Sequence, residues 1–451
     1  MLFNDFKDRL FEIAEKQGFE SYELYYVTSE DFNVQMFKGE IDKYSVNNTI
    51  GISFRGLYKG QMGYAYTEIM DEEAIDLLIR KAKENASVIE KEEHEEIFEG
   101  AEHYVNVGGY CEKIAKLHAG DKIELARQLE KATYAADKRV ESTQACGIAT
   151  HETNKRITNS KGMDRSFTSN IIYGFVGAVV KDENNTNSGN EIGITRNFDD
   201  LNIKKIAQDA VREGLSLFNA ESIKSGKYKV MFTNKASAEL LKTFRGIFSG
   251  ESAVKGLTLL KDKVGEIVAS ENITIYDNPL LENGICNIPF DDEGYMTSNK
   301  KVVDKGRLNT LLHNRATAKK FNIESTGNAS RASYSSPLAV SASNMYFQAG
   351  SKNYDEMIKI LQNGVVISKM QGMHSGANST TGDFSLSAKG FLIENGVLIK
   401  PVEQITISGN YFELLKNIEE VGCDLRFSYI GSTSSYGSPS IIVKELSIAG
   451  K

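Results

Sequence analysis

The sequence predicts an α+β fold, in which helices pack on antiparallel sheets, and three observations support that prediction. Apolar and polar residues alternate along several segments of the N-terminal half, as in strands with one solvated face. Segments with a helical apolar stripe stand before and after those strands. All five prolines and three Asn-Gly pairs fall beyond residue 227, which favours a C-terminal domain of mainly antiparallel β structure with a few helices.

The chain has 451 residues and is long enough for two or three domains. We predict an N-terminal α+β unit over 1–90, a second α+β unit over 115–222, and a C-terminal domain over 227–451. A polar, acidic connection over 89–102 separates the first two units, and 222–227 is a short linker. Both N-terminal units show the order helix, antiparallel strands, helix, so the N-terminal region is interpreted as a duplicated module.

The first unit begins with an amphipathic helix over 1–16, whose apolar residues recur three and four positions apart. Strands are predicted around 32–36, 50–54 and 62–66. Asp71 is the predicted N-cap of the closing helix, because glutamates follow it in the first turn and lysines occupy the last turn. The predicted buried stripe of that helix consists of Ala74, Leu77, Leu78 and Ala82.

The second unit repeats this order. A helix is predicted near Asp121–Asp137, strands near 148–150 and 171–180, and a final helix behind Asp199 and Asp200 as its aspartate cap. The apolar face of that final helix consists of Ile203, Ile206, Ala207, Ala210 and Val211.

The C-terminal domain carries a strong hairpin signal. Asn395-Gly396 stands between two three-residue apolar runs, 391–393 and 397–399, which is typical of a two-residue β-turn. Helices are predicted near Ala236–Ile247, Tyr354–Leu361 and Tyr411–Ile418.

Composition argues against two classes of partner. The net charge is −8, and lysines and arginines gather only in adjacent pairs, so no nucleic acid partner is expected. No apolar run approaches the roughly 18 residues of a membrane span, and the first segment is an amphipathic helix and not a signal peptide. We therefore expect a cytoplasmic protein without membrane contact.

Four cysteines lie far apart in the sequence, and a chain of this size needs no disulfide framework, so four reduced thiols are expected. Cys423 is interpreted as a small core residue. The sequence contains no Gly-x-Ser-x-Gly elbow, no phosphate-binding loop and no His-Glu-x-x-His helix.

Two polar clusters are candidates for a site. One is a glycine-rich segment between two strands, which contains His374, Asn378 and Asp383. These residues either face a peptide or partner, or belong to a turn whose Asn and Asp side chains cap its own backbone. The run Asp291-Asp292-Glu293 offers carboxylates to a cation, but Glu-Gly before a strand favours a turn.

The stretch Phe244–Ser270 resembles the active-site segment of the TldD/PmbA family of metallopeptidases. It contains Gly256 and ends on Val264-Gly265-Glu266-Ile267-Val268-Ala269-Ser270. Further segments that look like family landmarks follow in family order at 291–294, 325–329, 381–385, 393–396 with 401–402, and 447–450.

The resemblance implies that a helix of the catalytic members carries the motif His-Glu-x-x-x-His. Those three positions correspond here to Leu241, Lys242 and Gly246, which cannot bind zinc or act as a carboxylate base. A third ligand, a cysteine, is implied within the loop around 429–437, which contains no cysteine here. Glu251, the nearest carboxylate, is interpreted as solvated. The chain therefore resembles the non-catalytic PmbA/TldE-type branch, with no catalytic residue and no cofactor of its own.

The resemblance implies a cytoplasmic complex with a zinc-bearing, TldD-like catalytic subunit that degrades or trims extended, unfolded peptides. An alternative is a homodimeric, non-enzymatic protein that binds peptides or a regulatory partner. A third hypothesis is a peptidase whose metal site is assembled from His374, Asp383 and Cys423. Part of the family carries the label modulator of DNA gyrase.

Overall fold

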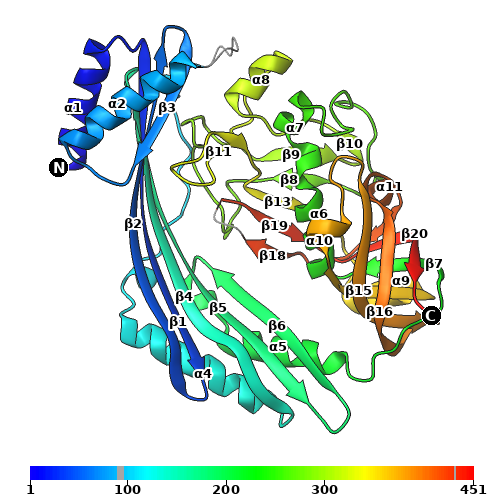
Figure 1. Cartoon of the computed structure of the whole chain (residues 1–451). Helices are drawn as coiled ribbons and strands as arrows, with labels where there is room; N and C mark the ends of the chain where they lie inside the picture. Colours follow the sequence, from blue (N-terminus) through cyan, green and yellow to red (C-terminus); the bar gives the residue numbers. More distant parts are fainter. Residues whose placement is uncertain (89–95, 431–432) are drawn as a thin grey trace.

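The computed structural model describes residues 1–88, 96–430 and 433–451 (Figure 1). Part of the predicted acidic connection, residues 89–95, therefore lies outside the described residues. The predicted α+β class is confirmed, since helices pack on mainly antiparallel sheets, with two parallel strand pairs among the described strands of the C-terminal domain. None of the described helices has the length and apolar character needed to cross a membrane.

The N-terminal half forms one long six-stranded antiparallel sheet in the order β3-β2-β1-β4-β5-β6. Its strands are β1 (Ser21–Phe37), β2 (Glu40–Tyr58), β3 (Gln61–Thr67), β4 (Val140–Asn159), β5 (Asp164–Lys181) and β6 (Thr186–Thr195). Strands β1 and β4 pair over thirteen successive positions, from Glu23–Asn159 to Gln35–Gly147. Strands from both predicted N-terminal units thus lie in one sheet.

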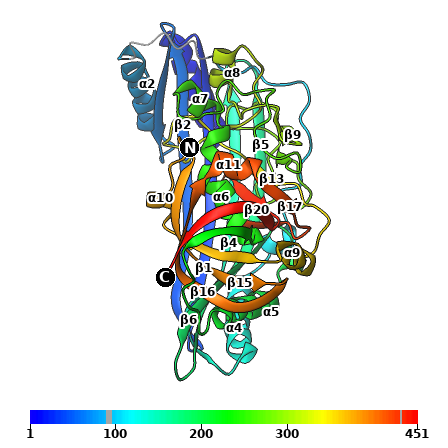
Figure 2. The same ribbon diagram turned by 90° about the vertical axis from the view of Figure 1, so that its right-hand side faces the viewer.

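Helices cover the two ends of this sheet separately. The helices are α1 (Phe3–Lys16), α2 (Glu72–Ser87), α3 (Glu112–Ala115), α4 (Ala119–Ala136) and α5 (Ile203–Ser216), with a 3-10 turn η1 (Phe198–Asp200) before α5. Helices α1 and α2 share one hydrophobic cluster with β1–β3, while α4 and α5 share a second cluster with β1, β4 and β5. Figure 2 shows the strands running from the level of α2 to that of α4 and α5.

Local capping chemistry fixes most helix starts. Asp71 accepts a hydrogen bond from the backbone N–H of Ala74 at 2.8 Å, as predicted. The predicted aspartate cap of α5 is wrong: Asn202 accepts from the N–H of Lys205, because Asp199 and Asp200 are part of the preceding 3-10 turn.

The C-terminal domain contains two six-stranded sheets and a two-stranded one. The first comprises β7 (Gly226–Phe232), β14 (Gly364–Gln371), β15 (Asp383–Glu394), β16 (Val397–Asn410), β17 (Ile418–Val421) and β20 (Ile441–Ala449), in the order β16-β15-β14-β7-β20-β17. Because β16 also pairs with β20, five of these strands form a closed ring. The predicted Asn395-Gly396 turn joins β15 to β16, and both residues have positive φ.

The second sheet runs in the order β10-β9-β8-β13-β19-β18. Its strands are β8 (Ile275–Asp277), β9 (Lys300–Asp304), β10 (Arg307–Leu308), β13 (Asn344–Phe347), β18 (Arg426–Ile430) and β19 (Ser435–Ser438); β11 (Ala329–Ser330) and β12 (Ala339–Val340) form the two-stranded sheet. The helices are α6 (Asn234–Phe244), α7 (Gly250–Val254), α8 (Arg315–Phe321), α9 (Tyr354–Leu361), α10 (Met373–Gly376) and α11 (Tyr411–Lys416), with a 3-10 turn η2 (Arg245–Phe248). One large hydrophobic cluster runs through both sheets and α6.

Candidate functional site

Helix α6 and the turn η2 carry the positions that correspond to zinc chemistry in the family resemblance. Leu241 is fully buried in the C-terminal hydrophobic cluster, while Lys242 and Gly246 are half-buried. An aliphatic side chain, an ammonium group and a glycine offer no zinc ligand. The residues present here therefore do not fit the metal, and we derive no catalytic step through it.

A pocket of about 310 Å³ opens beside these positions, lined by Gly246, Glu251 and Lys255 among others. The Glu251 carboxylate is 2.6 Å from the Lys255 ammonium and accepts a hydrogen bond from the backbone N–H of Val340 at 3.2 Å. The Glu251 side chain is 33% exposed and thus partly solvated, as interpreted, and the pocket wall also supplies partners for both carboxylate oxygens.

Asn378 and Asp383 form the polar turn behind α10. The Asn378 side chain accepts from the backbone N–H groups of Thr380 and Thr381, and Asp383 accepts from the Asn410 amide at 2.9 Å. The hydrogen bonds of Asp383 with the side chains of Asn410 and Thr381 lower the pKa of its carboxyl. His374 lies exposed in α10, and Ser379 of the same segment lines the pocket beside α6.

The cysteines are free thiols, and Cys423 is exposed, so its interpretation as a core residue is wrong. Its backbone N–H donates to the Lys352 carbonyl at 2.7 Å, directly after the bridge between Lys352 and Gly422. Within the described residues, no three His, Cys, Asp or Glu side chains are placed to hold a metal, His374, Asp383 and Cys423 included. Residues 431–432 of the loop around 429–437 lie outside the described part.

His313 lies behind the pocket and is only 2% exposed. Its Nδ1 is 3.2 Å from the Thr317 hydroxyl, its ring contacts Phe321, and a Cβ at Gly250 would approach Nδ1 to 2.2 Å. Burial lowers the pKa of this imidazole to about 4. His313 is thus a neutral packing residue at neutral pH.

We expect this histidine to make folding sensitive to acid. The unfolded chain takes up a proton on this imidazole near pH 6.5 and the folded chain only near pH 4. The free energy of unfolding should therefore fall as pH drops through that window, by up to about 3 kcal/mol. Urea unfolding at pH 7 and 4.5 checks this. In His313→Gln the fall in the free energy of unfolding that this imidazole causes should be absent. The same pH dependence in the variant and the wild type would show that His313 is not its source.

The run Asp291-Asp292-Glu293 is almost completely buried, between the N-terminal sheet and the C-terminal domain. Asp291 accepts from the backbone N–H groups of Glu293, Tyr295 and Ala329, and burial next to Glu293 raises the pKa of its carboxyl. This part of the run is the turn that the sequence favours over a cation site.

The other two carboxylates reach across to the sheet. Asp292 pairs with Lys155 of β4, and Glu293 lies 3.7 Å from Arg55 of β2. Burial opposes the charge of Lys155, but the Asp292 carboxylate outweighs it and raises the pKa of the ammonium group. Arg55 also binds Glu23 through two nitrogens, at 3.1 and 3.2 Å.

Removing one partner of this buried pair should destabilise the protein strongly. Lys155→Ala leaves the Asp292 carboxylate buried without its counter-ion, and we expect a loss of about 3–5 kcal/mol in the free energy of unfolding. The matched control is Lys181→Ala on β5, whose pair with Glu141 is about half exposed; there we expect about 1 kcal/mol or less. Urea unfolding measures both losses. Equal losses in the two variants would show that the buried Lys155–Asp292 pair contributes no more to the free energy of unfolding than an exposed pair.

A second set of ion pairs joins the other end of the sheet to the C-terminal domain. Glu191 of β6 is 4% exposed, lies 2.8 Å from Lys235 of α6, and also pairs with Arg426 of β18. No local pattern predicts these pairs, because each cation is distant in the chain from its partner in the other half.

Two cavities lie between these contacts, on the side of the sheet that faces the C-terminal domain. One, of about 340 Å³, includes Tyr25, Lys155 and Ser169; the other, of about 930 Å³, includes Tyr173 and β18 residues. His151 lines both, and its Nδ1 is 2.7 Å from the Asp31 carboxylate.

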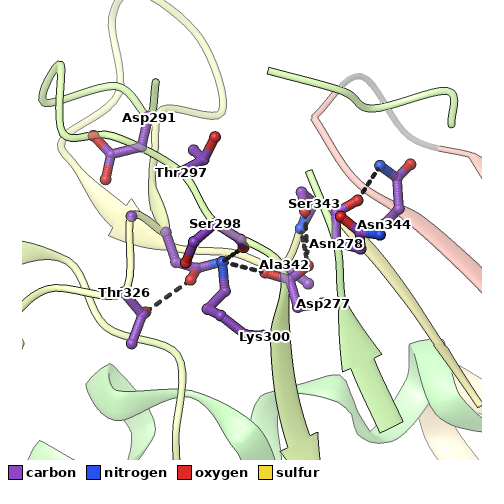
Figure 3. Close-up of polar contacts among 12 residues, drawn as sticks. Asp277, Asn278, Asp291, Thr297, Ser298, Lys300, Thr326, Ala342, Ser343 and Asn344 are labelled. Atoms are coloured by element: carbon purple, nitrogen blue, oxygen red, sulfur yellow. Dashed lines mark hydrogen bonds and ion pairs between the residues drawn. The ribbon is translucent and has the colours of Figure 1, made fainter. Parts of the chain in front are cut away.

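A buried polar network makes one wall of the smaller cavity rigid (Figure 3). Asp277 accepts from the backbone N–H and the hydroxyl of Ser343 and from the Asn328 amide, and lies 3.3 Å from the Lys300 ammonium. Asn344 bonds both Asn287 and the backbone carbonyl of Asn278. Ser343 and Asn328 also line the cavity.

Three family models match the chain in order. The PmbA/TldA metallopeptidase domain 1 matches residues 22–86, the central domain 112–218, and the C-terminal domain 225–450. Metalloprotease PmbA of Escherichia coli O157:H7 is 29% identical over 339 residues, which cover 75% of this chain and 71% of the relative.

Solved structures agree with those matches. A proposed modulator of a DNA gyrase from Thermotoga maritima is 33% identical with a TM-score of 0.90, covering 99% of this chain and all of the other. TldE from Thermococcus kodakarensis shares the fold at 23% identity and a TM-score of 0.89, with 99% and 100% coverage. With three family domains matched in order along most of its length, the chain belongs to the PmbA/TldD metallopeptidase family.

Proposed function

We propose that this chain is the TldE/PmbA-like subunit of a cytoplasmic zinc metallopeptidase that degrades or trims unfolded peptides. In this proposal the chain holds no zinc of its own, and a catalytic, TldD-like chain supplies the metal. The observation that carries the proposal is that Leu241, Lys242 and Gly246 of α6 and η2 stand at the positions of two ligands and a base, and of these Gly246 lines the adjacent pocket.

The cavities between sheet and C-terminal domain suit a polypeptide in extended conformation. Their walls combine hydroxyl groups and strand backbone with apolar side chains such as Ile171 and Phe167. Main-chain recognition by strands is weakly selective for sequence, which fits unfolded peptides as substrates. The net charge of −8 argues against a nucleic acid as a partner.

The first test is the zinc content and the activity of the chain purified without a metal-affinity tag. We expect less than about 0.1 zinc per chain, because no described cluster offers three donors. The chain alone should not cleave casein, a disordered protein, whereas mixing it with a catalytic family member should raise that member's rate. Chelator-sensitive cleavage by the chain alone would overturn the proposal.

A variant pair tests whether peptides occupy the cavity. Ser169 lines the smaller cavity from β5, so Ser169→Trp should fill it and lower casein cleavage by the reconstituted pair at least about tenfold. Ser166→Trp is the matched control, because residues three apart on a strand face opposite sides and Ser166 is exposed. Equal activity of the two variants would place the substrate path elsewhere.

A further inference from the structure

The smaller cavity, of about 340 Å³, is lined by three lysine or arginine side chains and one carboxylate among the described residues. The cations are Lys155 of β4, Arg196 directly after β6 and Arg331 directly after β11, and the carboxylate is Asp292. Both Asp292 oxygens are engaged, because one pairs with Lys155 and the other accepts from the backbone N–H of Arg331 at 2.7 Å. The cavity wall therefore carries an excess of positive charge.

Arg331 is buried without its normal hydrogen bonds. It is 3% exposed, and no described residue accepts a hydrogen bond from its three guanidinium nitrogens. The ring centroids of Tyr25 and Tyr64 lie 5.1 and 5.4 Å from the guanidinium carbon, and Glu23 Oε1 lies 3.5 Å from the guanidinium. Both Glu23 oxygens already accept from Arg55. Because buried guanidinium groups normally have acceptors, this one needs an acceptor from outside the chain.

Arg196 is a second cation that lacks a carboxylate. Its guanidinium donates to the backbone carbonyls of Ile285 and Gly109, at 2.7 and 2.9 Å, and no described carboxylate pairs with it. Burial lowers the pKa of this guanidinium. The two carbonyls hold the side chain in place but carry no net charge, so the positive charge of Arg196 is not neutralised.

We propose that this cavity binds a carboxylate of an extended peptide, from an Asp or Glu side chain or from the C-terminus. The anion follows from Arg196 and Arg331, while the peptide as its carrier rests on the proposed function. A planar carboxylate matches the fork of N–H groups on a guanidinium, and a buried site strengthens such bonds. Hydroxyl groups of Ser29, Thr49 and Ser169 line the cavity from the sheet and offer further donors.

Fluorescence anisotropy of the purified full chain with short, unstructured peptides tests the site. Three peptides of glycine, serine and alanine carry the same dye. One has a central Asp and an amidated C-terminus, one a central Asn and a free C-terminus, and one a central Asn and an amidated C-terminus. At low salt at least one acidic peptide should bind about tenfold more tightly than the neutral one.

The same comparison separates the two sources of the carboxylate. Tighter binding of the Asp peptide identifies a side chain, and tighter binding of the peptide with the free C-terminus identifies the terminus. The preference should weaken as salt is added, because it depends on charge. Equal binding of all three peptides, or binding of none, would overturn the proposal.

A matched pair of variants tests whether the carboxylate binds in this cavity. Ser169→Glu adds an anion to the cavity wall, and Ser169→Gln adds a side chain of nearly the same shape without the charge. The preferred acidic peptide should bind Ser169→Glu at least about tenfold more weakly than Ser169→Gln. The neutral peptide should not distinguish them. Equal affinity of both variants for the acidic peptide would contradict the site.

A second variant removes the guanidinium that lacks acceptors. Arg331→Met should lose the preference for the acidic peptide over the neutral one. Arg165→Met on β5 is the matched control and should keep it, because Arg165 also packs on a tyrosine ring, that of Tyr104 at 4.6 Å, but is exposed and does not line the cavity. A retained preference in an Arg331→Met chain with the circular dichroism of the wild type would contradict the proposal.

These measurements separate the carboxylate site from the proposed function. Peptide affinities of the chain alone test the site, and casein cleavage by the reconstituted pair tests the function. Equal binding of all peptides by a chain that supports cleavage would overturn the site only. Carboxylate-selective binding by a chain that supports no cleavage would overturn the function only.

Discussion

The buried charges between the N-terminal sheet and the C-terminal domain determine the arrangement of the whole molecule. Lys155 of β4 and Arg55 of β2 meet Asp292 and Glu293, which one turn of the C-terminal domain supplies. Removing such charges from water costs several kcal/mol per ion, so they are tolerated only where each finds its partner. A misplaced sheet would leave Lys155, Asp292 and Glu293 without these partners, while Arg55 would keep only Glu23 of its own sheet. The network therefore selects one docking of the two halves, while apolar packing within each half supplies stability.

That docking leaves two cavities between the halves. Ion pairs of Glu191 hold the far end, and the cavities of about 340 and 930 Å³ lie between the two contacts. Rigid walls preserve this space: Asp277 and its partners fix the segments that carry Asn328 and Ser343. Burying polar groups costs free energy unless each group has a hydrogen-bond partner. Here the buried network holds in place loops that a hydrophobic core does not cover.

Helix α6, which carries Leu241 and Lys242, has a structural role in the C-terminal core. Leu241 is buried, and Phe244 at the end of α6 stacks on Tyr411 with ring centroids 4.4 Å apart. Both contacts belong to the C-terminal core. The packing role of α6 therefore does not depend on which side chains face the pocket. This explains how a family fold can persist where the donor atoms of a metal site are absent.

The sequence alone determined the fold class, most elements and the absence of ligands at Leu241, Lys242 and Gly246, because periodicity, caps such as Asp71 and the Asn395-Gly396 turn are local properties. Only the tertiary structure decided which charged side chains pair with one another. Lys155 and Asp292 are 137 positions apart, and no local pattern relates them. The exposure of Cys423, the partners of Glu251 and the cavities also depend on packing between distant segments, and sequence periodicity carries no information about such contacts.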